Sequence, residues 1–561
     1  MAHIRLSRLL TLRFFLFGLV LLTLIPDASS AKDTPYLAAV QSFADCVLAH
    51  GLDTHGEEQT PLFADGLHVQ TLQPVVWRKD GEEWILSNFA SQQPLLRTLD
   101  GLTGLTGEAS YRQAAKAATN YALTHLVSPS GLLYWGGHMA WDLRGDRDVG
   151  QYASDIHELK SHQPYYTLFW RVNPKATARL LGAIWGTHIL DWSRLDYNRH
   201  AKAKQPQAPK WDHPFDTNIA VPFPAQGSNL SFVNVTPPLL HTGVVLAGMG
   251  DHKKALQWTE RLLRRWQDGK HPQTGLCGGQ LSYREHDRAQ DALGHVHPEI
   301  NEAQIVASYH QTCRYHRLPL AQMQAGERLQ SHGGAYAEAG KRFIRWALND
   351  LAIYAKHCYN KKTGKFVAVM IDGTPLQWQK AKTDYYTPQS FAPRNPDGSL
   401  FWGYAMAYRL GHKASHWRIV REIARQLDLG DVGKADGAGR RLRFETNASN
   451  WQYIYALLEL HRATKDKTFL RLARRIGDTL VSRQSQTGLF PRSGWEYART
   501  GDEIPLALLH LSAALAGKAD ALPRPMMDSR FFHCEFDGPL EKHQQKRADR
   551  RTYDSRVFYG D

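Results

Sequence analysis

The sequence WQYIYALLELHRATKDKTFLRLARRIGDTLVSRQSQTGLF, residues 451–490, contains the pattern that predicts the fold. Its apolar residues recur at helical spacing on both sides of the polar turn 464–466, and a glycine-containing loop, 487–490, follows the second helix. The segment is a helical hairpin of about 40 residues, a length within the range of known helical repeats. One hairpin cannot bury its own apolar face, so it requires neighbours of the same construction.

Such neighbours are present in the chain. Hairpins of the same plan, each closed by a glycine-containing loop, occupy residues 95–131, residues 237–275 and, in a weaker copy, the run that ends at 363–366. Asn173-Pro174 is typical of an N-cap followed by proline at the first helical position, and it opens a further helix that we expect to continue through Trp192. Strand signals are sparse.

The spacing of the hairpins separates two helical architectures. A tandem solenoid keeps a tight period, whereas the closing glycines of this chain are unevenly spaced, with long aromatic and glycine-rich loops between them. Loops of that kind usually carry function. We therefore predict an all-α chain, folded as an α/α toroid with a few short β-strands in its loops.

The first 31 residues have the features of a secretory signal peptide. Three arginines precede an apolar run over residues 14–25, and Ser29-Ser30-Ala31 resembles a cleavage site. The apolar run is short for a membrane span, so we expect export to the periplasm or the exterior without stable membrane insertion. The toroid domain is predicted to cover residues 32–525, and residues 526–561 to form a C-terminal surface tail.

Composition limits the classes of partner. The chain of 561 residues has a formal net charge of +14, which suits a polyanionic partner such as an acidic polysaccharide. Nucleic acid is a poor candidate because the sequence has no zinc-finger spacing, no phosphate-binding loop and no basic helix with interleaved aromatics. The five cysteines are scattered and odd in number, so they imply neither a disulfide framework nor a cysteine zinc site. Nothing in the sequence specifies an oligomeric state.

Histidines, a glutamate and an arginine gather in residues 131–200. His138, Glu158 and His200 could form a site of two imidazoles and one carboxylate, which favours a transition metal and leaves coordination positions open. The trio is not spaced like a local ligand motif, so the residues alone leave other sites open. His295-Val296-His297, near Glu299 and Glu302, is the competing metal site.

The same stretch resembles a known family. Trp135-Gly136-Gly137-His138, His157-Glu158-Leu159-Lys160 and Arg199-His200 are similar to sequences of polysaccharide lyase family two, the pectate lyases of (α/α)7-barrel fold. The resemblance implies that His138, Glu158 and His200 bind a metal such as Mn²⁺ and that Arg199 is the Brønsted base. It also implies β-elimination: a proton leaves C5 of a galacturonate unit, the C4–O bond breaks, and a 4,5-unsaturated product forms.

Six further residues are candidates for substrate binding. Lys160 is adjacent to the trio and is also the alternative base; arginine forks suit carboxylates, and aromatic rings can stack on sugars. The six are Lys160, Arg284, Arg394, Trp135, Trp402 and Tyr404.

The sequence thus predicts an exported, metal-dependent pectate lyase that acts on polygalacturonate or oligogalacturonides, with residues 32–525 as its catalytic domain. Two alternatives remain. A uronyl hydrolase or another glycosidase on the same toroid would need paired carboxylates, for which Asp155 with Asp384 or Glu302 are the candidates. The second alternative is a protein that binds an acidic polysaccharide without catalysis.

Overall fold

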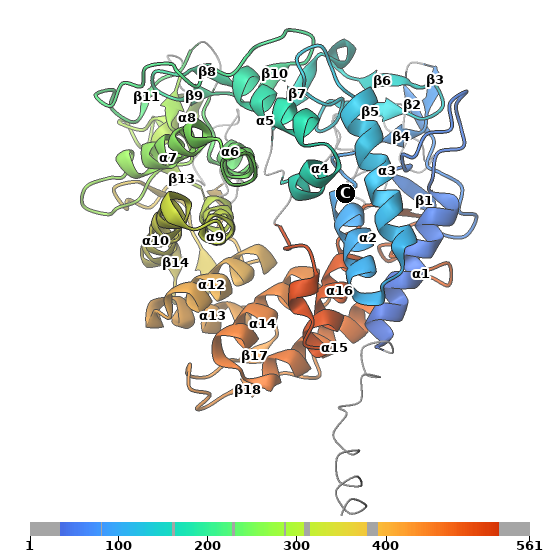
Figure 1. Cartoon of the computed structure of the whole chain (residues 1–561). Coiled ribbons are helices and arrows are strands. Elements are labelled where there is room, and N and C mark those ends of the chain that lie inside the picture. The colour runs from blue at the N-terminus through green and yellow to red at the C-terminus, as the bar shows by residue number, and fades with distance from the viewer. Residues whose placement is uncertain are drawn as a thin grey trace, which may run out of the picture.

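Two concentric layers of helices form a ring (Figure 1). The computed structural model describes residues 34–79, 81–159, 163–226, 230–284, 288–307, 315–377 and 391–526. The helices that line the inside of the ring are α2 (Gln93–Thr106), α4 (Tyr166–Val172), α6 (Thr236–Gly250), α9 (Arg317–Gln330), α12 (Gly398–Gly411), α14 (Trp451–Thr464) and α16 (Ile504–Leu515). The outer helices are α1 (Pro35–His50), α3 (Ala109–His125), α5 (Pro174–His188), α7 (Lys253–Asp268), α10 (Gly334–Cys358), α13 (Ala414–Gln426) and α15 (Lys467–Val481).

The distribution of apolar residues explains the two layers. Outer helices such as α7, α13 and α15 are amphipathic and bury one face, whereas α6 and α16 are apolar around nearly their whole circumference. A helix that is apolar on all sides must be covered on all sides. The inner helices are covered by the outer layer and by one another, and one continuous apolar core follows the ring.

Seven inner–outer pairs are present among the described helices, so the predicted α/α toroid is confirmed as an (α/α)7 barrel. The hairpin 451–490 forms as predicted, with α14 ending at Thr464 and α15 beginning at Lys467. Asn173 caps α5 as expected, since its Oδ1 accepts from the Ala176 backbone N–H at 3.0 Å. The prediction that α5 reaches Trp192 is wrong: the backbone becomes extended at Ile189 and continues as a strand.

The seventh pair closes the ring with helices from the two ends of the described chain. Outer helix α1 packs against inner helix α16, and the hydroxyls of Thr34 and Ser512 are 2.7 Å apart. The Tyr36 hydroxyl donates to Asp478 at 2.5 Å, which joins α1 to α15. The first and last hairpins therefore complete each other, and neither leaves an apolar face uncovered.

Short strands lie in the loops between helical pairs. The β4 (Leu86–Ser87), β5 (Met139–Asp142) and β6 (Arg147–Gly150) strands form one sheet. The two-stranded pairs are β1 (Gly66–His68) with β19 (Tyr497–Arg499), β2 (Trp77–Lys79) with β3 (Glu82–Trp84), β7 (Ile156–Glu158) with β10 (His200–Lys202), β8 (Ile189–Asp191) with β9 (Asp196–Tyr197), β11 (Phe223–Pro224) with β12 (Ser282–Tyr283), β13 (Ile305–Val306) with β16 (Val369–Met370), β14 (Tyr359–Asn360) with β15 (Lys365–Phe366), and β17 (Gly430–Asp431) with β18 (Arg441–Leu442). A short helix, α8 (Arg288–Leu293), lies among them.

The two ends of the ring differ in their loops. Turns of one to three residues join each inner helix to the outer helix that follows, as at residues 107–108 between α2 and α3. Each connection from an outer helix to the next inner helix is far longer; residues 126–165 between α3 and α4 are an example. All the long loops therefore emerge at the same end of the ring, and residues 131–200 contribute two adjacent loops there.

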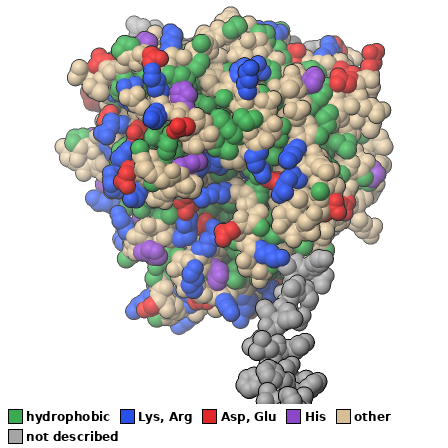
Figure 2. Space-filling model, viewed as in Figure 1, with side chains coloured by type: hydrophobic (Ala, Val, Ile, Leu, Met, Phe, Trp, Pro, Cys, Tyr) green, Lys and Arg blue, Asp and Glu red, His purple; other side chains and the backbone are tan. Residues whose placement is uncertain are grey.

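The described residues contain no helix long and apolar enough to cross a membrane. Figure 2 shows lysine and arginine side chains spread over one face of the molecule, with acidic side chains between them.

Candidate active site

A pair of short strands brings the two loops of residues 131–200 together. Strand β7 lies in the α3–α4 connection and β10 in the α5–α6 connection, and they pair antiparallel with His200 opposite Glu158. The Leu159 backbone N–H donates to the Arg199 carbonyl at 2.7 Å, which extends the ladder by one bond. Residues that are distant in sequence are thereby fixed side by side at the long-loop end of the ring.

The predicted ligand trio converges at this strand pair. One Glu158 carboxylate oxygen lies 3.6 Å from His138 Nε2 and the other lies 3.4 Å from His200 Nε2. The two Nε2 atoms are 3.4 Å apart. Ligand atoms from all three residues lie within 4.8 Å of one another. Among the described residues, this trio is the group of histidine and acidic side chains that could hold a metal ion.

The surroundings fit a metal ion. His138 Nδ1 is 3.1 Å from Gln151 Oε1 and donates to it, so the lone pair is on Nε2 and faces the carboxylate. Hydrogen bonding of the second ring nitrogen is the usual support for a metal-ligating imidazole. Gly137 makes room for the carboxylate, because a Cβ at this position would lie 1.8 Å from Glu158 Oε2. Two imidazole nitrogens and a carboxylate suit a transition metal.

Arg199 lies beside the trio. Its Nε is 3.7 Å from a Glu158 carboxylate oxygen, and its guanidinium lies 6.0 Å from the centre of the Phe232 ring. The side chain is 30% exposed, whereas that of Glu158 is 1% exposed. The arrangement places a guanidinium at the open side of a buried carboxylate. A cavity of about 340 Å³ adjoins the site and has His200 and Lys202 in its wall.

The family model of the periplasmic pectate lyases matches residues 60–535 of this sequence. The chain belongs to this family. It is therefore a polysaccharide lyase. The pectate disaccharide-lyase of Dickeya dadantii (strain 3937) is 27% identical over an alignment of 533 residues, which covers 89% of this chain and 93% of that protein.

Solved structures that resemble this pectate lyase family member are distant. A cellobiose 2-epimerase from Bacillus thermoamylovorans B4167 gives a TM-score of 0.38 at 10% identity, covering 85% of this chain and 99% of the epimerase. The cellobiose 2-epimerase from Spirochaeta thermophila DSM 6192 gives a TM-score of 0.40 at 13% identity, covering 79% of this chain and 98% of that epimerase. At these scores the similarity is loose, and the toroid is established by the order of this lyase's own helices.

Two aromatic residues predicted to stack on sugars lie in the core. Trp135 is 1% exposed, and its indole N–H donates to His157 Nε2 at 3.0 Å. Tyr404 is fully buried, and its hydroxyl donates to the Leu351 carbonyl at 2.9 Å. Neither ring has a face open to solvent, and a stacking role for either stays a prediction. Each fills the interior and satisfies its polar atom there.

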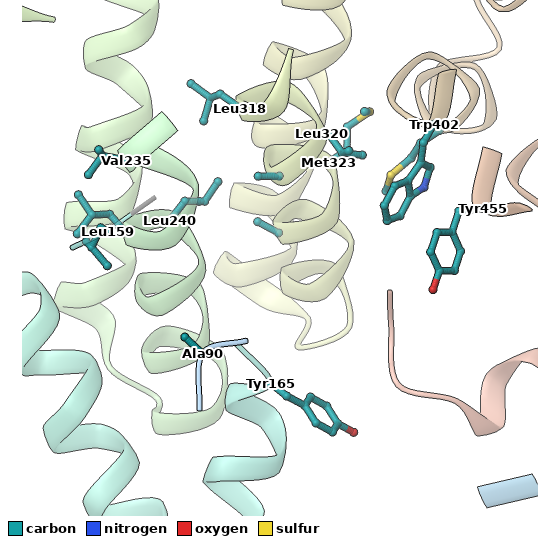
Figure 3. Packing of buried hydrophobic residues seen from close by; sticks show 14 of the residues in the cluster. Ala90, Leu159, Tyr165, Val235, Leu240, Leu318, Leu320, Met323, Trp402 and Tyr455 are labelled. Atoms are coloured by element: carbon teal, nitrogen blue, oxygen red, sulfur yellow. The ribbon is translucent and has the colours of Figure 1, made fainter. Parts of the chain in front are cut away.

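Trp402 lies inside the ring of helices. Its indole stacks on Tyr455 with ring centroids 4.8 Å apart, and Figure 3 shows the two rings next to each other. Trp402 also forms part of the wall of a cavity of about 370 Å³ that is lined by Glu327, Arg409 and Glu459. A sugar contact at Trp402 stays a prediction.

The basic residues predicted to bind substrate lie in different settings. Arg284 forms an ion pair with buried Glu302, in which its Nε is 3.0 Å from a carboxylate oxygen. Arg394 forms a backbone bridge with Phe366, four residues before the start of α12. Lys160 lies outside the described residues. Binding of a substrate carboxylate by any of the three stays a prediction.

The competing metal site does not assemble in the described part of the lyase, whereas the carboxylate pair stays a prediction. His297 Nε2 accepts the Gln377 backbone N–H at 3.0 Å, and no metal-ligand group forms around it there. Asp155 is 3.2 Å from Lys202 Nζ and also accepts the Lys204 backbone N–H. Asp384 lies outside the described residues, as do residues 1–31 and all of the predicted tail except Met526.

Gln151 is a site residue that the sequence did not reveal. It faces His138 because β5 and β6 form a hairpin with Met139 opposite Gly150, which places the two flanking residues opposite each other. The Gln151 backbone N–H also donates to the His138 carbonyl at 3.0 Å. The signal that could have located Gln151 is the register of this hairpin, which begins directly after His138.

Proposed function

We propose that this protein is an exported, metal-dependent pectate lyase that cleaves polygalacturonate or oligogalacturonides by β-elimination. The observation that carries the proposal is the convergence of His138, Glu158 and His200 beside Arg199 at the long-loop end of the toroid. The relative from Dickeya dadantii, named a pectate disaccharide-lyase, supports the substrate class. The signal-like sequence of residues 1–31 and the periplasmic description of the family support export.

In this proposal each residue of the site has one task. His138, Glu158 and His200 hold the metal, and Gln151 and Gly137 fix the orientation of two of these ligands. The metal, when bound, supplies positive charge that neutralises the C6 carboxylate of galacturonate and stabilises the charge that develops when C5 loses its proton. We assign manganese for two reasons. Imidazole ligands favour transition metals over Ca²⁺ and Mg²⁺, and manganese also readily accepts a carboxylate ligand.

Arg199 is assigned as the base. It removes the proton from C5, and the electron pair of that C–H bond forms the C4–C5 double bond as the C4–O bond breaks. The leaving oxygen departs with its electron pair and is then protonated, so no water is consumed. A free guanidinium keeps its proton up to a pH of about 12, so this role requires nearby positive charge and exclusion of water from the bound substrate.

The test is the ultraviolet absorbance of the mature protein mixed with polygalacturonate. Elimination creates a conjugated double bond that absorbs, whereas hydrolysis does not. We expect absorbance to rise, to stop rising after chelation, and to resume with Mn²⁺ but not with Ca²⁺. Reducing ends that appear without absorbance would replace the lyase assignment for this substrate with hydrolysis, and no reaction on any polygalacturonate fragment would overturn the proposed substrate. An amino terminus near Lys32 in the exported protein would verify signal cleavage.

A further inference from the structure

A buried chain of hydrogen bonds runs beneath the candidate metal site. The Trp135 indole N–H donates to His157 Nε2 at 3.0 Å, His157 Nδ1 lies 2.8 Å from His188 Nε2, and His188 Nδ1 lies 2.8 Å from the Asn198 carbonyl oxygen. The three ring-bearing side chains are 1%, 2% and 0% exposed, respectively. The three rings are therefore closed off from solvent, whereas Asn198 is only partly buried.

The direction of every bond in this chain is fixed by its two ends. An indole nitrogen can only donate, so His157 Nε2 accepts and the proton of that imidazole is on Nδ1. His157 therefore donates to His188 Nε2, and His188 carries its own proton on Nδ1 and donates it to the Asn198 carbonyl. Burial lowers the pKa of His188 to about 3, which agrees with a neutral ring.

The chain reaches each of the three segments that carry the proposed metal ligands. Trp135 is three residues before His138, His157 is adjacent to Glu158, and Asn198 is two residues before His200. The fourth member, His188, is the last residue of α5 and belongs to none of these segments. It makes a second bond to Asn198, whose backbone N–H donates to the His188 carbonyl at 3.0 Å.

We propose that the Trp135–His157–His188–Asn198 chain positions the metal ligands, with His188 as the residue that anchors the ligand segments to the rigid helix α5. The proposal rests on the proposed function, since it takes His138, Glu158 and His200 as the metal site. All three ligand segments lie in the connections between helices, one as a bend and two as short strands, and such connections hold side chains less accurately than helices do. A hydrogen-bonded support of this kind is what sets ligand separation before the metal enters.

Two substitutions at His188 separate positioning from simple packing. His188→Leu replaces the imidazole with an apolar side chain of similar size, so the packing is kept but both hydrogen bonds of the ring are lost. His188→Gln can restore both, because an amide oxygen accepts and an amide nitrogen donates. His416→Leu is the matched control: His416 is also fully buried and also bonds a backbone carbonyl, that of Leu348 at 3.0 Å, but it lies on α13, outside the site.

The experiment measures Mn²⁺ affinity of the chelator-treated full chain by calorimetry and the visible spectrum of the Co²⁺ form, together with thermal unfolding. We expect His188→Leu to weaken Mn²⁺ binding by about 10- to 100-fold, the usual loss for supports of metal ligands, and to alter the Co²⁺ spectrum. His188→Gln should recover most of the affinity and the spectrum. His416→Leu should lower the unfolding temperature without changing either.

Two outcomes overturn this proposal alone: wild-type affinity in folded His188→Leu, or an equal loss in His416→Leu. Failure of the proposed function has a different signature. If the wild-type protein binds Mn²⁺ but produces no unsaturated product, the lyase assignment for this substrate fails and the positioning role is unaffected. If the wild-type protein binds neither Mn²⁺ nor Co²⁺, both the proposed metal site and the proposed positioning role of the chain are contradicted.

Discussion

Glu158 and His200 are direct cross-strand neighbours in the β7–β10 pair, although an inner helix and an outer helix separate them in the sequence. Their side chains therefore meet because two loops pair, with a carboxylate oxygen 3.4 Å from Nε2. His138 joins them from a third segment, at 3.6 Å from the carboxylate. The site depends on loop pairing, so each contact in it can be tested without disturbing the helical ring.

Removing the charge of Glu158 should abolish the metal site. We expect Glu158→Gln to weaken Mn²⁺ binding by at least about 100-fold, the upper end of the loss caused by outer-shell changes, because it removes a ligand itself. Calorimetry and the rate of product absorbance would measure the two effects. Asp155→Asn is the control, since Asp155 lies on the same loop and pairs with Lys202. Equal losses in both variants would contradict the assignment of Glu158.

Arg199 should affect turnover and leave metal binding intact. A positioned base contributes about 10²- to 10⁴-fold to the rate, so we expect Arg199→Ala to lower kcat by that factor with little change in Mn²⁺ affinity. Arg199→Lys, which keeps the charge, reports how much of the effect is electrostatic. Initial rates over a range of polygalacturonate concentrations would separate kcat from KM. Full activity in Arg199→Ala would exclude it as the base and favour Lys160.

Gly137 should not tolerate a side chain. A Cβ there would lie 1.8 Å from Glu158 Oε2, so Gly137→Ala must displace the carboxylate, and we expect Mn²⁺ affinity to fall at least tenfold. Gly403→Ala is the matched control, because a Cβ at that helical glycine meets no atom within 4 Å. It should keep wild-type affinity and gain about 0.5–1 kcal/mol in stability. Unchanged metal binding in folded Gly137→Ala would show that the carboxylate relocates freely.

Stability should fall as the solution becomes more acidic, partly because of His510. Burial lowers the pKa of His510 to about 3, whereas an unfolded histidine titrates near 6.5. Between these values the unfolded chain binds a proton that the folded chain excludes, so each such residue reduces the free energy of unfolding by up to about 1.4 kcal/mol per pH unit as pH falls.

Urea unfolding of the metal-free wild type and of His510→Gln between about pH 6 and pH 4.5 would measure this effect. The two proteins share all the other groups that titrate in this range, so the difference between them reports on His510. We expect His510→Gln to have a shallower pH dependence than the wild type, by about 1.4 kcal/mol per pH unit. Parallel curves would mean that His510 takes up a proton in the folded state.

Local sequence patterns were sufficient for the helical ring and insufficient for the length of α5. The 451–490 hairpin forms at its predicted turn because periodicity and capping act within a few residues. α5 stops at His188 because that residue bonds Asn198 across the β8–β9 hairpin, a contact that no local pattern contains. The burial of Trp135 and Tyr404 was not predictable for a related reason: an aromatic side chain looks the same in sequence whether its ring is buried or open.

The sequence by itself predicted the toroid, the family and, through the family resemblance, the candidate ligand trio, because hairpin periodicity is local and the motifs around His138, Glu158 and Arg199-His200 are distinctive. Only the tertiary structure decided that these residues meet, that Gln151 orients His138, and that His157 and His188 lie between the ligand segments. The physical reason is that these contacts join segments that are distant in sequence or that face each other across a hairpin. Their distances are set by how the ring closes and how its loops pair, and neither is encoded in any single stretch of the chain.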